Sequence, residues 1–189
     1  MKYIYSLVIL SLLFSCSKIP DTRYFTLAHK SAESQNSGSD KVLVIKKIKS
    51  DPIYQQDKFV YRPSEYEIKF DHYRRWVQSP PQILTNRLKE YLKSRNDFKY
   101  VSSELYQNEG YLQLDCTLVR FEEIITGSKR DATVAVEYKL LQMPQEQLLT
   151  SGTIEKTEAI SGNSAEDIVK AMSTATFNVF SSLAGIIQE

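Results

Sequence analysis

The stretch ATVAVEYKLL, residues 132–141, is the clearest strand signal in the chain, because apolar side chains recur at every second position. Residues spaced in this way point to one side of an extended strand. They are Val134, Val136, Tyr138 and Leu140. Residues 111–125 and 147–159 are strand candidates on either side, and short segments join the three. Because short connections link neighbouring antiparallel strands, an antiparallel meander is predicted.

Further strands are predicted nearer the N-terminus. Residues 41–49 (KVLVIKKIK) carry apolar side chains on both faces near their start, so both faces are expected to be covered there. Shorter strands are expected at residues 23–27 and 98–101.

Residues 58–70 have the pattern of a β-hairpin. The segment RPSE, residues 62–65, supplies the turn, and alternating apolar residues precede and follow it. On the returning strand Tyr66, Ile68 and Phe70 are expected to point inward.

A first helix is predicted over residues 79–97. Ser79 is suited to cap it, Pro80 suits the first helical position, and Gln82 completes a capping box. The apolar stripe of this helix consists of Leu84, Leu88, Tyr91 and Leu92.

A second helix is predicted over residues 164–187, capped by Ser164 with Asp167 at the third helical position. Its apolar stripe consists of Ile168, Met172, Ala175, Val179, Leu183 and Ile186. We interpret it as a core helix. The alternative of a membrane-surface helix lacks the basic polar face that such helices carry.

These elements predict an α+β fold, a two-layer sandwich with a mixed, mostly antiparallel sheet of six or seven strands and the two main helices on one face. The other face of the sheet would then stay open to a partner.

The N-terminus resembles a bacterial lipoprotein signal peptide. Lys2 precedes an apolar run that ends at Phe14, which is shorter than the roughly 20 residues of a bilayer-spanning helix. The stretch LLFSCSK, residues 12–18, resembles the lipobox, with Cys16 at the position that is lipidated and becomes the new N-terminus. The alternatives are an ordinary cleaved signal with a coincidental cysteine and a short uncleaved anchor.

This resemblance implies that Cys16 receives a diacylglyceryl thioether and an amide-linked acyl chain such as palmitate. Ser17, in place of aspartate, implies sorting to the outer membrane in bacteria that use this rule, with the inner membrane as the alternative. The expected organisation is a signal peptide over residues 1–15, a lipidated N-terminus with a short strand and a flexible loop over 16–40, and a single domain over 41–189.

Composition limits the partners of the mature chain. Without residues 1–15, which include Lys2, 23 basic residues balance the 23 acidic ones, so no net field attracts nucleic acid. Cys116 is the one thiol left once Cys16 is modified, so no intramolecular disulfide is expected. Cys116 lies on the apolar face of its strand and is predicted to be buried and inert.

The sequence lacks the motifs of common catalytic sites, and its many carboxylates are scattered. His29 and His72 are its two histidines, too few for a histidine-rich metal cluster, and His72 is not accompanied by a G-x-S-x-G turn. Glycine-rich phosphate loops are absent as well. We therefore expect that the protein is not an enzyme and that it binds neither a cofactor nor a metal ion. An envelope enzyme would require a polar pocket that converges on His72.

Residues 54–76 are unusually aromatic, and basic residues are interspersed among them. One interpretation places the aromatic residues in the core of the hairpin. The other makes the segment an amphipathic docking surface, because Tyr, Trp and Arg are favoured at protein interfaces. The candidate interface residues are Tyr66, Tyr73, Arg74, Arg75 and Trp76.

Beyond the lipobox, the element YFTL at residues 24–27 and the stretch VYRPSEYEIKFDHYRRWVQSPPQIL at residues 60–84 resemble the ABC-type transport auxiliary lipoprotein component family. In that family a Tyr-Arg hairpin leads through aromatic residues to a tryptophan and a proline that opens a helix. The residues in those positions here are Tyr61, Arg62, Tyr66, Tyr73, Trp76 and Pro80. Val77 departs from the small residue that often follows the tryptophan.

The resemblance implies a non-catalytic, membrane-anchored periplasmic subunit, which the sorting rule for Ser17 would place at the outer membrane. Such proteins accompany an ABC ATPase, its permease and an exported MCE (mammalian cell entry) domain protein, in systems that move lipids or other hydrophobic compounds between membranes. Homo-oligomers are a further expectation. The alternative function is an envelope assembly or structural lipoprotein without a link to an ABC transporter.

Overall fold

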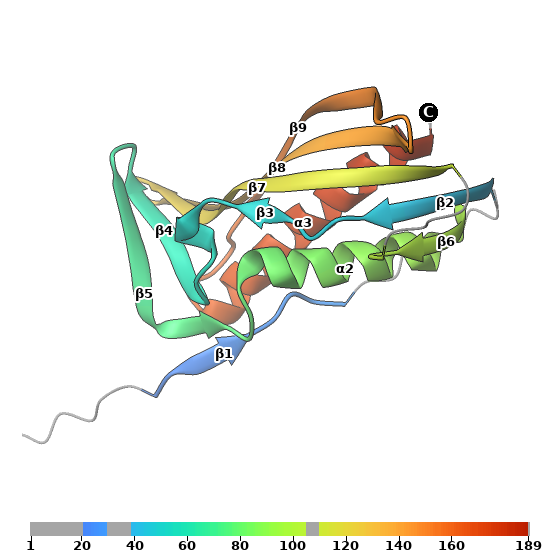
Figure 1. Ribbon diagram of the computed structural model, residues 1–189. Helices are drawn as coiled ribbons and strands as arrows, with labels where there is room; N and C mark the ends of the chain where they lie inside the picture. Colours follow the sequence, from blue (N-terminus) through green and yellow to red (C-terminus); the bar gives the residue numbers. More distant parts are fainter. Residues whose placement is uncertain (1–20, 30–38, 105–109, 189) are drawn as a thin grey trace, which may run out of the picture.

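The computed structural model describes residues 21–29, 39–104 and 110–188. In this part of the chain a mixed sheet of nine strands carries two long helices on one face, which confirms the predicted α+β class (Figure 1). The elements are β1 (Arg23–Phe25), β2 (Ser39–Ile45), β3 (Lys49–Ser50), the 3-10 helix η2 (Pro52–Tyr54), β4 (Lys58–Ser64), β5 (Glu67–Trp76), α2 (Pro80–Arg95), β6 (Phe98–Ser102), β7 (Tyr111–Thr126), β8 (Lys129–Met143), β9 (Gln147–Ala159) and α3 (Ala165–Gln188).

Strand β7 organises the sheet. Along one edge it pairs antiparallel with β8, which pairs antiparallel with β9, so the predicted meander is confirmed. Along the other edge β2, β3 and β4 pair with it one after another, and all three are parallel to it. Beyond these, β6 joins β2 in parallel, β5 joins β4 antiparallel, and β1 joins β5 in parallel.

The predicted strand over residues 41–49 is interrupted. β2 begins at Ser39 and ends at Ile45, and the chain returns to β7 as β3 at Lys49. Between them the backbone N–H of Ile48 donates to Oγ1 of Thr85 on α2, at 3.0 Å. The strand is interrupted here because the N–H of the buried Ile48 donates to the side chain of Thr85 and not to a neighbouring strand. Residues 30–38, most of the expected flexible loop, lie outside the described residues.

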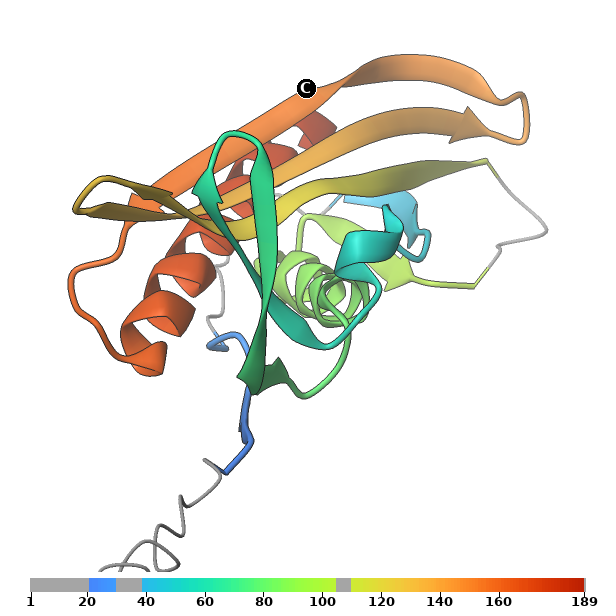
Figure 2. The ribbon, with the colours of Figure 1, turned by 90° about the vertical axis from the view of Figure 1, so that its left-hand side faces the viewer.

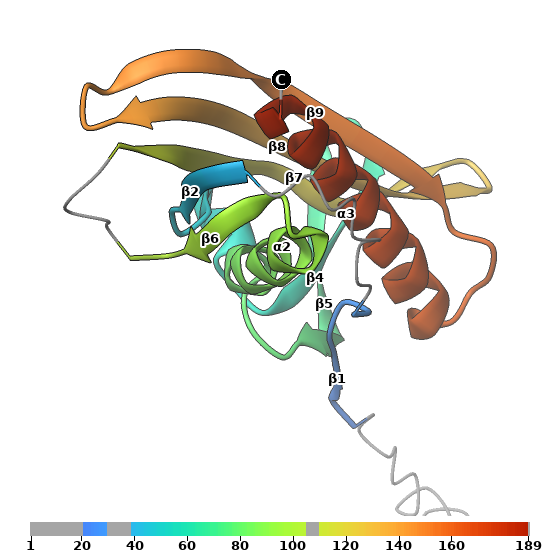
Figure 3. The same ribbon diagram turned by 90° about the vertical axis from the view of Figure 1, so that its right-hand side faces the viewer.

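The two helices lie side by side under the same face of the sheet (Figures 2 and 3). The predicted stripe of α2 is buried, and so is that of α3 except at its end, where Ile187 is buried and Ile186 half-buried. Because the apolar side of α3 packs into the core, the core-helix interpretation is confirmed. Within the three described ranges, no helix has the length and hydropathy of a bilayer-spanning segment.

Cys116 lies in this core, as predicted. Burial raises the pKa of its thiol to about 12, with a smaller contribution from the charge of Asp115. Because the thiolate is the nucleophilic form, the thiol is unreactive at neutral pH.

The two helix starts differ. In α3, Oγ of Ser164 accepts the backbone N–H of Asp167 at 3.1 Å, while the Asp167 carboxylate accepts the N–H of Ser164 at 3.0 Å, so the predicted cap is confirmed. The capping box predicted for α2 is wrong, because Ser79 makes no side-chain capping bond to any described residue. Pro80 and Pro81 occupy the first two helical positions and have no N–H to donate.

This difference predicts unequal effects of two identical substitutions. Ser164→Ala removes a capping hydrogen bond and is expected to lower the free energy of unfolding by about 1 kcal/mol. Ser79→Ala removes no such bond, and its expected effect is within about 0.5 kcal/mol. Urea denaturation of both variants measures the two values, and equal losses would contradict the assignment of the caps.

Candidate functional site

The candidate interface lies on the β4–β5 hairpin, which projects from the sheet with its tip away from both helices (Figure 1). The predicted turn is displaced, since residues 62–64 still belong to β4 and the chain turns at Glu65 and Tyr66. Tyr66 at the tip is 89 % exposed and Ile68 is exposed beside it, so the expectation that they point inward is wrong. The tip extends beyond the helix layer, and no helix in the described chain covers it.

The two candidate arginines hold the base of the hairpin. Arg74 forms an ion pair with Asp71 at 2.6 Å, and Arg75 forms one with Asp57 at 2.7 Å. Asp71 also accepts the backbone N–H groups of Tyr73 and Arg74, at 2.8 and 2.7 Å. Burial raises the pKa of Asp71, but these hydrogen bonds and the charge of Arg74 outweigh burial and lower the pKa overall. Both arginines are half-buried, so their ion pairs contribute to the local structure.

Trp76 belongs to the core and not to a surface. Its exposed fraction is 2 %, its ring stacks on Phe59 with centroids 4.2 Å apart, and it meets the ring of Phe121 edge-on at 5.3 Å. The expectation that Trp76 contributes to a docking surface is thus corrected, because strand alternation places it on the helix side of β5. Tyr73, three residues earlier, is 43 % exposed.

A buried carboxylate that sequence reasoning missed ties the hairpin to β7. Glu122 is fully buried and accepts hydrogen bonds from Nε of Arg62 at 3.0 Å and from the Tyr54 hydroxyl at 3.1 Å. Burial, and then the charge of Glu122, raise the pKa of Tyr54. No sequence signal separates this glutamate from the other acidic residues, because Arg62 and Tyr54 are 60 and 68 positions away in the chain.

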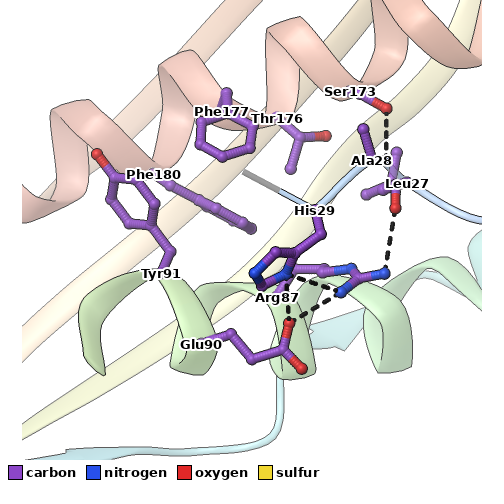
Figure 4. Close-up of a pocket in the computed structure, with 10 residues that line it drawn as sticks. All are labelled: Leu27, Ala28, His29, Arg87, Glu90, Tyr91, Ser173, Thr176, Phe177 and Phe180. Carbon is purple, nitrogen blue, oxygen red and sulfur yellow. Dashed lines mark hydrogen bonds and ion pairs between the residues drawn. The ribbon is translucent and has the colours of Figure 1, made fainter. Parts of the chain in front are cut away.

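The segment after β1 is held between the two helices (Figure 4). Leu27 is buried there, its carbonyl accepts from Arg87 of α2 at 3.2 Å, and the N–H of Ala28 donates to Oγ of Ser173 of α3 at 3.1 Å. His29 lies 3.4 Å from the Glu90 carboxylate.

The cavity beside this segment has a volume of about 10 Å³, which is room for one water molecule. It is lined by the rings of Tyr91, Phe177 and Phe180 and by groups of the N-terminal segment. We therefore interpret it as a packing defect at the attachment of the N-terminal segment and not as a ligand site.

The open face of the sheet carries a wider hollow of about 700 Å³ beside β3. Its lining is mixed: Lys46, Lys49, Lys139, Asp115 and Glu137 contribute charged groups, while apolar atoms make up slightly more than half of the exposed area. Among the described side chains, no group of three or more His, Cys, Asp or Glu residues is arranged to hold a metal ion. Cys16 lies outside the described residues.

Comparisons with solved structures show the same fold in proteins of low identity. A Xanthomonas campestris protein has a TM-score of 0.77 at 18% identity, over 88% of this chain and 95% of its own. An uncharacterized protein, for which no organism is given, has a TM-score of 0.74 at 16% identity, over 89% and 99%. A hypothetical protein of Chlamydia trachomatis has a TM-score of 0.55 at 5% identity, over 79% and 96%.

A search of curated proteins finds no significant match. The sequence model of one family does match, and it covers residues 25–184, which include α2, all of α3 but its last four residues, and every described strand except most of β1. Its description is "ABC-type transport auxiliary lipoprotein component". The chain therefore belongs to the ABC-type transport auxiliary lipoprotein component family.

Proposed function

We propose that this protein is a non-catalytic accessory subunit of an ABC-type system that moves lipids or other hydrophobic compounds between membranes. In this proposal acyl chains on Cys16 anchor it at the periplasmic face of the outer membrane. Its domain docks an MCE-domain protein that works with the permease and the ATPase. The observation that carries the proposal is the family match over residues 25–184, which begins nine residues after Cys16 in a stretch that resembles a lipobox.

The physical role of such a subunit is to hold a binding surface at a membrane. Anchoring raises the local concentration at which the domain meets a partner that spans the gap between the two membranes. The sequence supplies no evident catalytic constellation, and the family is one of auxiliary transport lipoproteins.

We assign partner docking to the hairpin tip, Tyr66 and Ile68. The burial of Trp76 holds the base of the hairpin in the fold, and the Arg62–Glu122 ion pair ties β4 to β7 close to the turn, so the tip is presented on a rigid support. An exposed tyrosine beside an apolar residue is a common centre of binding energy at interfaces, and a rigid support lowers the entropy lost on binding.

A double substitution tests this assignment. Tyr66→Ala with Ile68→Ser is expected to weaken retention of the cognate MCE-domain protein by about fivefold or more, which is about 1 kcal/mol. Its thermal midpoint should stay close to that of the unmodified protein, because both side chains are exposed. Pull-down with the purified lipoprotein measures the retention.

Tyr100→Ala is the matched control, since Tyr100 is an exposed tyrosine on β6 at the other end of the molecule. Equal retention by the double variant and this control would exclude the hairpin tip as the docking site. If the unmodified protein retained no MCE-domain protein, the result would favour the alternative of an envelope assembly lipoprotein.

A further inference from the structure

The chain enters the domain at a fixed point. Three residues of β1 pair with the end of β5, and Leu27 is buried directly afterwards. Arg23 forms an ion pair with Glu166 at the start of α3, and Val77 donates its N–H to the carbonyl of Phe25 at 2.9 Å. The N-terminal segment is therefore attached at one corner of the domain, where β1, the end of β5 and the start of α3 meet.

The outward side of this corner carries large exposed side chains. The register pairs Tyr24 with Arg75, so Tyr73, two residues before Arg75, is on the same face as Tyr24, and Val77 follows directly after the end of β5. The exposed fractions are 63 % for Tyr24, 43 % for Tyr73 and 54 % for Val77. We call these three residues the anchor-side patch.

The distance along the chain from Cys16 limits where this corner can be. Seven residues from Ser17 to Arg23 span at most about 23 Å at roughly 3.3 Å per residue. A domain of this size has a radius of gyration of about 16 Å and is roughly 40 Å across. An anchor at Cys16 therefore cannot reach a membrane that faces the opposite end of the domain, because the tether is shorter than the domain.

The three arginines near the anchor-side patch are paired, while Lys58, opposite Arg75 in the register, lies over the ring of Phe70. The guanidinium groups of Arg23, Arg74 and Arg75 each form an ion pair with a carboxylate, from Glu166, Asp71 and Asp57 respectively. The patch therefore presents neutral aromatic and aliphatic groups. Tyrosine is enriched at the interface between lipid headgroups and acyl chains, where its ring is buried and its hydroxyl stays hydrated.

From the fixed chain entry, the short tether and the exposed residues around it, we propose that the anchor-side patch of Tyr24, Tyr73 and Val77 rests in the lipid interface of the membrane that holds Cys16. The inference depends on the anchoring in the proposed function. It fixes an orientation in which β1 faces the lipid, while β6 and the β8–β9 turn, at the other end of the molecule in Figure 1, point away.

The test uses the mature lipidated protein in vesicles of phosphatidylethanolamine and phosphatidylglycerol, with and without phosphatidylcholine brominated in its acyl chains. Tyr24→Trp introduces an indole into the anchor-side patch, and Tyr100→Trp introduces one at an equally exposed position, 57 % accessible, on β6. Trp76, the one native tryptophan, is buried, so the unmodified protein supplies the background emission.

We expect brominated lipid to remove most of the added emission of the Tyr24→Trp variant and to leave that of the Tyr100→Trp variant unchanged. The quenching should persist at 1 M salt, where the Debye length is about 3 Å, because the contact does not depend on charge. Unquenched emission from Tyr24→Trp in protein that floats with the vesicles overturns the orientation but leaves the anchor intact. That result would point instead to a protein partner as the occupant of the patch. Failure to float overturns both the anchor and the orientation.

Discussion

Exchange of residues 1–16 for an ordinary cleavable export signal is expected to move the protein from the membrane fraction to the soluble fraction. One myristoyl-sized chain binds a bilayer with a constant of only about 10⁴ M⁻¹, and a lipoprotein cysteine carries several chains. Their loss should therefore weaken membrane association by more than about 10⁴-fold. Fractionation of the envelope measures the change, and mass spectrometry of the native N-terminus should find acylated Cys16.

Ser17→Ala is the control for this exchange, because it leaves Cys16 and its acyl chains in place. This variant should remain in the membrane fraction. Its distribution between the inner and outer membranes can differ, because Ser17 is the residue that the sorting rule reads. If the variant without Cys16 stayed bound to membranes, acylation would not be the anchor. A density gradient that separates inner from outer membrane tests the expected location of the unmodified protein.

Trp76→Ala is expected to lower the free energy of unfolding by about 3–5 kcal/mol, as replacement of a large buried aromatic side chain does. The ring of Trp76 fills the space between Phe59 and Phe121, where the end of β5 meets the core. Natural domains are stable by about 5–15 kcal/mol, so the loss is a large part of the total. The thermal midpoint should fall by about 6–20 °C for a domain of this size.

Tyr66→Ala is the comparison, because this tyrosine lies on the same hairpin but at its exposed tip. Its expected effect on stability is within about 0.5 kcal/mol. Urea denaturation followed by circular dichroism measures both variants, since the Trp76→Ala variant has no tryptophan emission. An unchanged urea midpoint for Trp76→Ala would contradict the assignment of Trp76 to the core.

Both helices and the meander could be predicted because their signals are local. The apolar stripes of α2 and α3 and the alternation in β8 each arise within one element. Such an apolar face is buried whichever element packs against it. The cap of α3 was also predictable, because its two residues, Ser164 and Asp167, are three positions apart in the sequence. The failure of the cap at Ser79 was not predictable, because it depends on the Gln82 N–H, which donates to the Ser79 carbonyl and not to its hydroxyl.

The β4–β5 hairpin shows the limit of local signals. Tyr66 and Trp76 are both aromatic residues of an alternating segment, yet one is 89 % exposed and the other 2 %. What separates them is the distance of each from the helix layer, together with the turn at Glu65 and Tyr66. The parallel pairing of β2, β3 and β4 along β7 joins residues that are far apart in sequence, and no local pattern encodes it.

By itself the sequence determined the α+β class, the two helices and the meander, because the period of apolar residues is a property of each segment. It also predicted the lipid anchor at Cys16, through a motif of neighbouring residues. Only the tertiary structure decided that Trp76 is core, that Glu122 holds the hairpin, and that Tyr24, Tyr73 and Val77 lie together. These outcomes depend on which distant strands and helices meet, and burial is decided by that packing.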